Sequence, residues 1–142
     1  MAQGDFTLFQ EVAAACSNSM DFDADLLKLA LVTSAVTPAA GDVTPALADY
    51  TEVATGGNYA AGGTDVVATF TETGGLATLN GTDVTWLQHA SNPTDARWAI
   101  LYDDTTGTDE CIGFFDLGAV TDMTLGNLTV AFHASGIATF TI

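Results

Sequence analysis

The stretch "LLKLALVTSA", residues 26–35, decides the fold because its apolar residues repeat with the period of a β-strand. One side of an extended chain receives Leu27, Leu29, Leu31 and Thr33. The other side receives Lys28, Ala30 and Val32, because successive side chains of a strand point to opposite faces. The stretch therefore predicts a β-strand with one strongly apolar face.

Further runs rich in β-branched and aromatic residues fill most of the chain. They are "YTEVA" (50–54), "VVATFT" (66–71), "LATLN" (76–80), "DVTWLQ" (83–88), "ARWAILYD" (96–103), "CIGFFDLG" (111–118), "NLTVAFH" (127–133) and "IATFTI" (137–142). Turn-forming pairs such as Asn80-Gly81 and Ser135-Gly136 separate them. The pattern predicts a mainly β fold, an antiparallel β-sandwich or a barrel-like, jelly-roll-like domain, and 142 residues predict a single domain over 1–142.

Two segments depart from the strand pattern. Residues 1–20 predict a short N-terminal helix, because "TLFQ" (7–10) fits a capping box and apolar residues then recur at four-residue spacing. Such a helix either packs on the main body or docks onto a neighbouring subunit. Residues 36–49 predict a long loop, because Pro38 and Pro45 discourage strand pairing, and a long loop in a compact domain is a contact candidate.

The charge balance excludes several classes of partner. The chain has 18 Asp and Glu against 2 Lys and Arg, a formal net charge of -16. Nucleic-acid binding requires Lys and Arg to neutralise phosphates, and anionic membranes repel acidic surfaces, so neither partner is expected. A cationic protein surface or a divalent cation remains compatible with this charge. The chain shows no signal-peptide pattern and no apolar run of membrane-spanning length, so we expect a product made in a cytoplasm.

The stretch "TGGNYAAGG", residues 55–63, resembles a ligand-binding glycine loop at first sight. A phosphate loop needs GxxxxGK[ST], but Gly63 and Thr64 follow the second glycine here, and no helix pattern comes next. We therefore interpret the stretch as a turn between strands. Tyr59 at its tip faces either the core or another subunit.

No motif for catalysis or for a resident cofactor is present, and we expect neither an enzyme nor a cofactor. "DFDAD" (21–25) begins like a calcium loop, but Leu26 and Val32 stand where Gly and Glu are required. The acidic loops leave adventitious calcium binding open. His89 and His133 lie far apart in the chain, and whether Cys16 and Cys111 pair is left open. Arg97 is expected to pair with a carboxylate or to contact a subunit.

Several motifs, taken in order, carry a resemblance. They are "FTLF" (6–9), "LKLALVTSA" (27–35), "ADYTEV" (48–53), "GNYAAGG" (57–63), "TDVTW" (82–86), "DARWAILYDD" (95–104) and "IGFFDLG" (112–118). In these motifs the chain resembles a family of small acidic virion proteins of tailed bacteriophages, of the capsid decoration or cement type. The motifs extend through nearly the whole chain.

The resemblance implies a structural virion protein on the capsid exterior, with the major capsid protein and further copies of itself as partners. Such a protein binds the outside of an assembled phage head and stabilises the shell by noncovalent contacts between capsomers. We expect the contacts at Phe6, Phe9, Pro38, Pro45, Tyr50 and Tyr59. Two alternatives are a phage tail or tail-tip structural protein and, in another class, a β-sandwich carbohydrate-binding module that uses exposed Trp or Tyr side chains.

Overall fold

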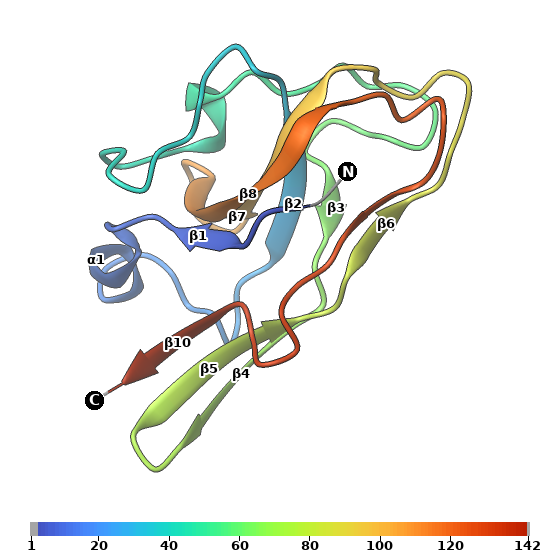
Figure 1. The fold of residues 1–142 in the computed structure, drawn as a ribbon. Helices are drawn as coiled ribbons and strands as arrows, with labels where there is room; N and C mark the ends of the chain where they lie inside the picture. Colours follow the sequence, from blue (N-terminus) through green and yellow to red (C-terminus); the bar gives the residue numbers. More distant parts are fainter. Residues whose placement is uncertain (1–2, 142) are drawn as a thin grey trace.

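A five-stranded antiparallel sheet forms the centre of the molecule, whose computed structural model describes residues 3–141 (Figure 1). In spatial order its strands are β1 (Phe6–Leu8), β8 (Glu110–Thr121), β7 (Ala96–Asp103), β2 (Leu27–Val32) and β3 (Thr64–Asp65). β2 pairs with β7 along its whole length, from Leu27 opposite Asp103 to Val32 opposite Trp98. The leucine-rich stretch thus forms an inner strand of the main sheet, as its pattern predicts.

Two smaller sheets complete the strand content. One has the order β10 (Ala138–Thr141), β5 (Leu76–Gly81), β4 (Ala68–Thr73), and the other pairs β6 (Val84–Trp86) with β9 (Leu128–Val130). All pairings are antiparallel, and no sheet of the described residues closes into a barrel. The predicted mainly β, antiparallel fold is confirmed, in an open, sandwich-like form. In Figure 1 the β4–β5 hairpin and β10 extend below the main sheet.

Both faces of the central sheet are covered. On one face the leucines of β2 join a large apolar cluster with Leu79 of β5, Val84 and Trp86 of β6, and Val130 of β9. On the other face a smaller cluster gathers the residues Phe9, Ala30, Val32, Leu47, Tyr50, Ile100, Tyr102, Cys111 and Phe114. Because a strand covered on both sides needs apolar residues at every position, β2 is an almost unbroken apolar run.

The N-terminal segment differs from its prediction. A helix is present, α1 (Val12–Cys16), but residues of the expected capping box belong to β1 and to the turn after it. Phe6 pairs with Phe115 and Leu8 with Gly113, because the edge of β8 offers backbone groups that a strand satisfies and a helix does not. Besides α1 the described residues contain the 3₁₀ helix η1 (Leu47–Asp49), and neither has the length and apolar character to cross a membrane.

Candidate binding surfaces

Five of the six residues expected at an interface are buried in the protein itself. Phe9 has no exposed surface, Tyr59 is 1% exposed and Tyr50 is 6% exposed, while Pro38 and Pro45 are also buried. We therefore correct these five assignments: the side chains pack inside this chain and are not available to a partner. Phe6 is half-buried, with its ring 5.0 Å from that of Phe115.

The loop of residues 36–49 covers the second face of the central sheet. The Pro45 carbonyl accepts a hydrogen bond from Cys111 N at 2.8 Å, and the Tyr50 hydroxyl donates to Asp42 Oδ2 at 2.7 Å. Leu47 and Tyr50 enter the smaller apolar cluster. The segment includes the 3₁₀ helix η1, and its apolar residues are used to bury the sheet.

The glycine-rich stretch is a turn whose tip is tied to the core. Gly56 and Tyr59 exchange two backbone hydrogen bonds, at 3.0 and 2.9 Å. The Tyr59 hydroxyl donates to Glu52 Oε1 at 2.6 Å and accepts from the buried Leu31 N at 3.0 Å. The turn interpretation is confirmed, and Tyr59 faces the core. Gly63 has φ +75°, and a Cβ there would lie 1.9 Å from the Leu29 carbonyl oxygen, so the backbone approach requires glycine.

Both cationic side chains of the sequence are engaged within the protein. Lys28 Nζ lies 3.2 Å from Asp104 Oδ2. Arg97 pairs with Asp116 and stacks over the Trp98 ring at 4.2 Å, which confirms the predicted carboxylate partner. This pairing holds the pKa of the Asp116 carboxyl below its usual range. Because both cations are paired within the protein, the charge exposed to solvent comes from the remaining acids and is negative.

The carboxyl of Asp103, the last residue of β7, lies close to the half-buried Asp25 carboxyl. Asp103 has no exposed surface, and its Oδ1 accepts from Thr105 N at 2.9 Å. Burial, and then the neighbouring Asp25 carboxyl, raise the pKa of Asp103 to about 6. Within residues 3–141 no three His, Cys, Asp or Glu side chains converge into a metal-binding group.

The histidines and cysteines lie in separate local contexts. His89 Nδ1 accepts from Ser91 N, and His133 Nδ1 accepts from Ser135 N, so each histidine closes its own turn. Cys16 is half-buried and Cys111 is buried, and they are not joined to each other. Burial raises the pKa of both thiols.

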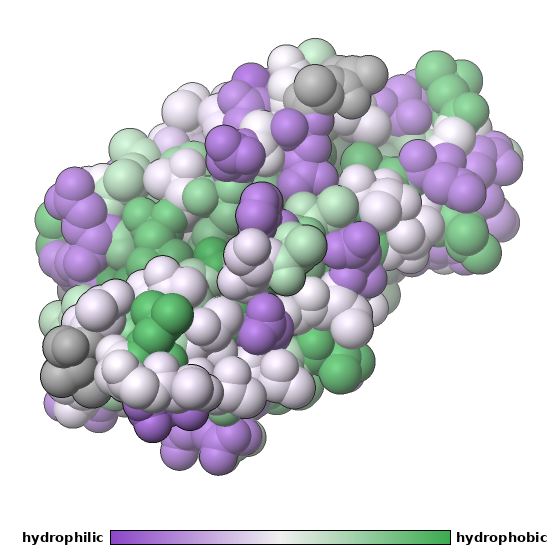
Figure 2. All heavy atoms as spheres, turned by 60° about the horizontal axis from the view of Figure 1, so that its bottom comes forward, coloured by the Kyte–Doolittle hydropathy of each residue, from purple (hydrophilic) through white to green (hydrophobic). Residues whose placement is uncertain are grey.

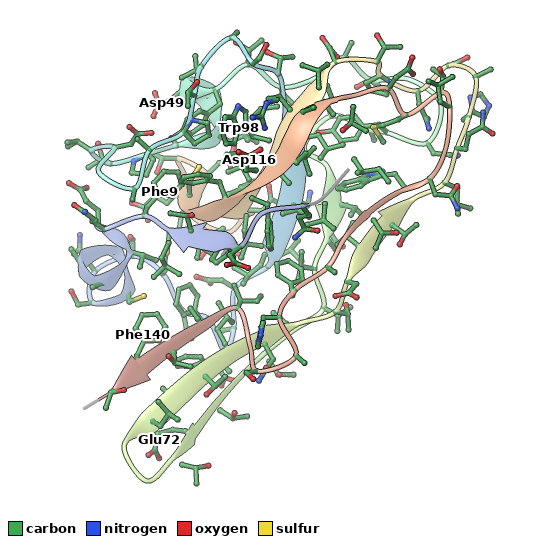
Figure 3. The ribbon with its side chains drawn as sticks, in the orientation of Figure 1. Phe9, Asp49, Glu72, Trp98, Asp116 and Phe140 are labelled. Carbon is green, nitrogen blue, oxygen red and sulfur yellow. The ribbon has the colours of Figure 1, made fainter. Side chains whose placement is uncertain are left out.

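An apolar groove lies between α1 and the sheet of β4, β5 and β10. Its volume is about 860 Å³, within the range of ligand-binding clefts. It is lined by Ala13, Cys16, Ser17, Met20, Asp21, Phe22, Phe70, Glu72, Ala77 and Phe140. Figure 3 places Phe140 between β10 and α1, and Glu72 near the far end of the hairpin. In Figure 2, which brings the hairpin forward, green apolar surface borders the pale surface of the hairpin.

The sequence contains a signal for this groove that our sequence-based list of contacts missed. In β4, Ala68, Phe70 and Glu72 alternate with threonines, so the strand has one mixed face and one threonine face. The paired registers place Ala77 of β5 and Phe140 of β10 on the same side as Glu72. The alternation of residues along the strands could identify this face of the β4–β5–β10 sheet. Only the tertiary structure shows that α1 does not cover the face completely.

The aromatic side chains offer no flat platform for a sugar in the described residues. Tyr50, Tyr59, Tyr102 and Trp86 are buried. Trp98 is half-buried, with Arg97 over its ring and the edge of Phe114 at 6.0 Å between centroids. Stacking of a sugar on an exposed Trp or Tyr, as a carbohydrate-binding module requires, would need these rings to be freed first.

Comparisons with protein-family models, with curated proteins and with solved structures found no match to this chain. A functional proposal therefore depends on the residues, the charge and the surfaces described above.

Proposed function

We propose that this protein is a structural virion protein of the capsid decoration type, which binds the outside of an assembled phage head. The proposal extends the resemblance of the ordered motifs between residues 6 and 118. The observation that carries it is the uncompensated acidic surface: both cations pair internally, with Asp104 and Asp116. An outer layer of uniform negative charge keeps particles apart in suspension and does not adsorb to nucleic acid.

The fold is suited to mechanical reinforcement. The central sheet is buried on both faces, and the loop of residues 36–49 is anchored to it by backbone hydrogen bonds to Asp109 and Cys111. Such a body transmits force between two attachment points without rearranging. A subunit that binds only the intact lattice stabilises that lattice by mass action, and no catalytic residue or cofactor is needed.

The partners in this proposal are the major capsid protein and neighbouring copies on the particle. The test is the copy number of this chain relative to the major capsid protein in purified particles, measured by quantitative mass spectrometry. Hundreds of copies per particle support decoration of the head. A handful would instead place the chain in the tail or at its tip, and complete absence would refute a virion role.

A second measurement tests stabilisation directly. Particles stripped of the protein should release their DNA at lower temperature than intact particles, and purified protein added back should restore the original release temperature. Unchanged release after stripping would contradict a cement function. Retardation on a glycan-containing affinity gel, abolished by Trp98→Ala, would favour the carbohydrate-binding alternative over decoration.

A further inference from the structure

We propose that the groove between α1 and the β4–β5–β10 sheet is the docking site for a basic segment of another protein that carries apolar side chains. This inference rests on the proposed function, which supplies the identity of the partner: a neighbouring shell protein. The groove, its rim and its charge give the chemistry of the occupant.

The floor of the groove is aromatic and only partly covered. Phe22, Phe70 and Phe140 form a cluster with ring centroids 5.7 to 6.2 Å apart. Phe22 is buried, whereas Phe70 and Phe140 stay half-buried with part of their rings open to solvent. Three aromatic rings and Met20 offer an occupant the apolar contact that anchors most protein interfaces.

The rim of the groove is acidic on both sides. Asp21 stands at the α1 side and Glu72 on β4, and both are exposed. Each carboxylate uses one oxygen locally: Asp21 Oδ1 accepts from Asp23 N, and Glu72 Oε1 accepts from Gly75 N. The second oxygen of each has no hydrogen-bond donor among residues 3–141, so it is free for a Lys or Arg of a partner.

Charge decides between the possible occupants. A second copy of this chain would bring another net charge of -16 to an acidic rim, and its Lys28 and Arg97 are already paired. An anionic lipid surface would be repelled for the same reason. A basic segment with apolar side chains is the occupant that complements both the floor and the rim.

The experiment measures the binding of synthetic peptides to the purified chain by fluorescence anisotropy at physiological salt. One peptide alternates Leu and Lys, a second of equal charge alternates Ser and Lys, and a third alternates Leu and Glu. We expect the Leu-Lys peptide to bind about tenfold or more tightly than either control, since only it satisfies both floor and rim. Equal binding of the Leu-Lys and Ser-Lys peptides would mean adsorption to the acidic surface and would overturn the proposal.

Matched variants locate the binding. Glu72→Gln keeps the acceptor for Gly75 but removes the rim charge, and Asp95→Asn removes an exposed charge elsewhere. Phe140→Ser opens the floor, and Leu76→Ser changes a more exposed apolar residue of the same sheet that does not line the groove. We expect Glu72→Gln and Phe140→Ser to weaken binding of the Leu-Lys peptide several-fold. The controls Asp95→Asn and Leu76→Ser should not weaken it. If each control variant weakened peptide binding as much as its partner, docking in the groove would be refuted.

Cys16 supplies a measurement that does not depend on any substitution. Its half-buried thiol lines the groove, whereas Cys111 is buried elsewhere in the core. Bound Leu-Lys peptide should slow the reaction of Cys16 with a thiol reagent, and no protection would contradict docking there.

These results separate the two proposals. Groove-dependent peptide binding by a chain that is absent from purified particles would refute the virion role and support the groove. A chain that is abundant in purified particles but binds no peptide would support the virion role and refute docking in the groove.

Discussion

At the scale of single residues, Asp103 shows how one buried carboxyl responds to its surroundings. It has no exposed surface, its Oδ2 has no hydrogen-bond donor in residues 3–141, and the Asp25 carboxyl lies beside it. Two neighbouring carboxyls are most stable when one of them holds a proton. Burial is the larger cause, and together with the neighbouring Asp25 carboxyl it favours the protonated form of Asp103 in the folded state.

The stability contribution of Asp103 should therefore fall as pH rises. Its pKa is about 6 in the folded protein and lower in the unfolded chain, so the stabilisation is present below the unfolded pKa and is lost as pH rises through about 6. Asp103→Asn should remove this loss and raise the free energy of unfolding at pH 8 by at most about 3 kcal/mol. Urea denaturation at pH 5 and pH 8 measures it, with the exposed Asp95→Asn as control. An equal effect of Asp103→Asn at both pH values would contradict the prediction.

Tyr59 is a second residue whose polar atom serves the fold. Its hydroxyl is the acceptor for the buried Leu31 N, and it donates to Glu52. Tyr59→Phe leaves the ring against Trp86, with centroids 5.9 Å apart, but removes the partner of a buried N–H. We expect a loss of about 2 kcal/mol in the free energy of unfolding, measured by chemical denaturation. A loss below about 0.5 kcal/mol would show that the N–H finds another acceptor.

At the scale of elements, the glycine turn tests how closely two segments pack. Gly63→Ala would place a Cβ 1.9 Å from the Leu29 carbonyl oxygen at a positive φ, so we expect a loss of about 3 kcal/mol or more. Gly74, in the β4–β5 turn, also has positive φ, but a Cβ added there would meet no atom within 4 Å. Gly74→Ala should therefore cost only about 1 kcal/mol. Thermal denaturation compares the two, and equal losses would mean that φ alone, and not the close approach, matters.

Element prediction succeeded where a run of residues has one period and few competing partners. β7 has the bounds predicted for "ARWAILYD", because β-branched and aromatic residues favour strand and turns flank the run. It failed at residues 6–10, where a local capping pattern lost to pairing with β8. It also overstated "YTEVA", which makes only one bridge, between Val32 and Glu52. Both errors come from partners distant in sequence.

At the scale of the whole molecule, the net charge of -16 opposes the folded state at low ionic strength. The melting temperature should therefore rise as NaCl increases from about 10 mM to about 500 mM, because screening shortens the reach of like-charge repulsion. Differential scanning calorimetry measures it. A melting temperature that does not change with NaCl would contradict this prediction.

Calcium provides a separate comparison at the same scale. If the acidic loops bind calcium only adventitiously, CaCl₂ and MgCl₂ of equal ionic strength should raise the melting temperature equally. A saturable increase that is specific to calcium would show that the acidic loops form a defined site.

The sequence by itself determined the fold class, the turns and the net charge, because these follow from composition and from the period of neighbouring residues. Only the tertiary structure decided which apolar residues remain accessible. Phe9, Tyr50 and Tyr59 are aromatic, as Phe70 and Phe140 are, yet the first three are buried and the last two line a groove. Accessibility depends on what packs over a side chain, and those covering residues lie far away in the sequence.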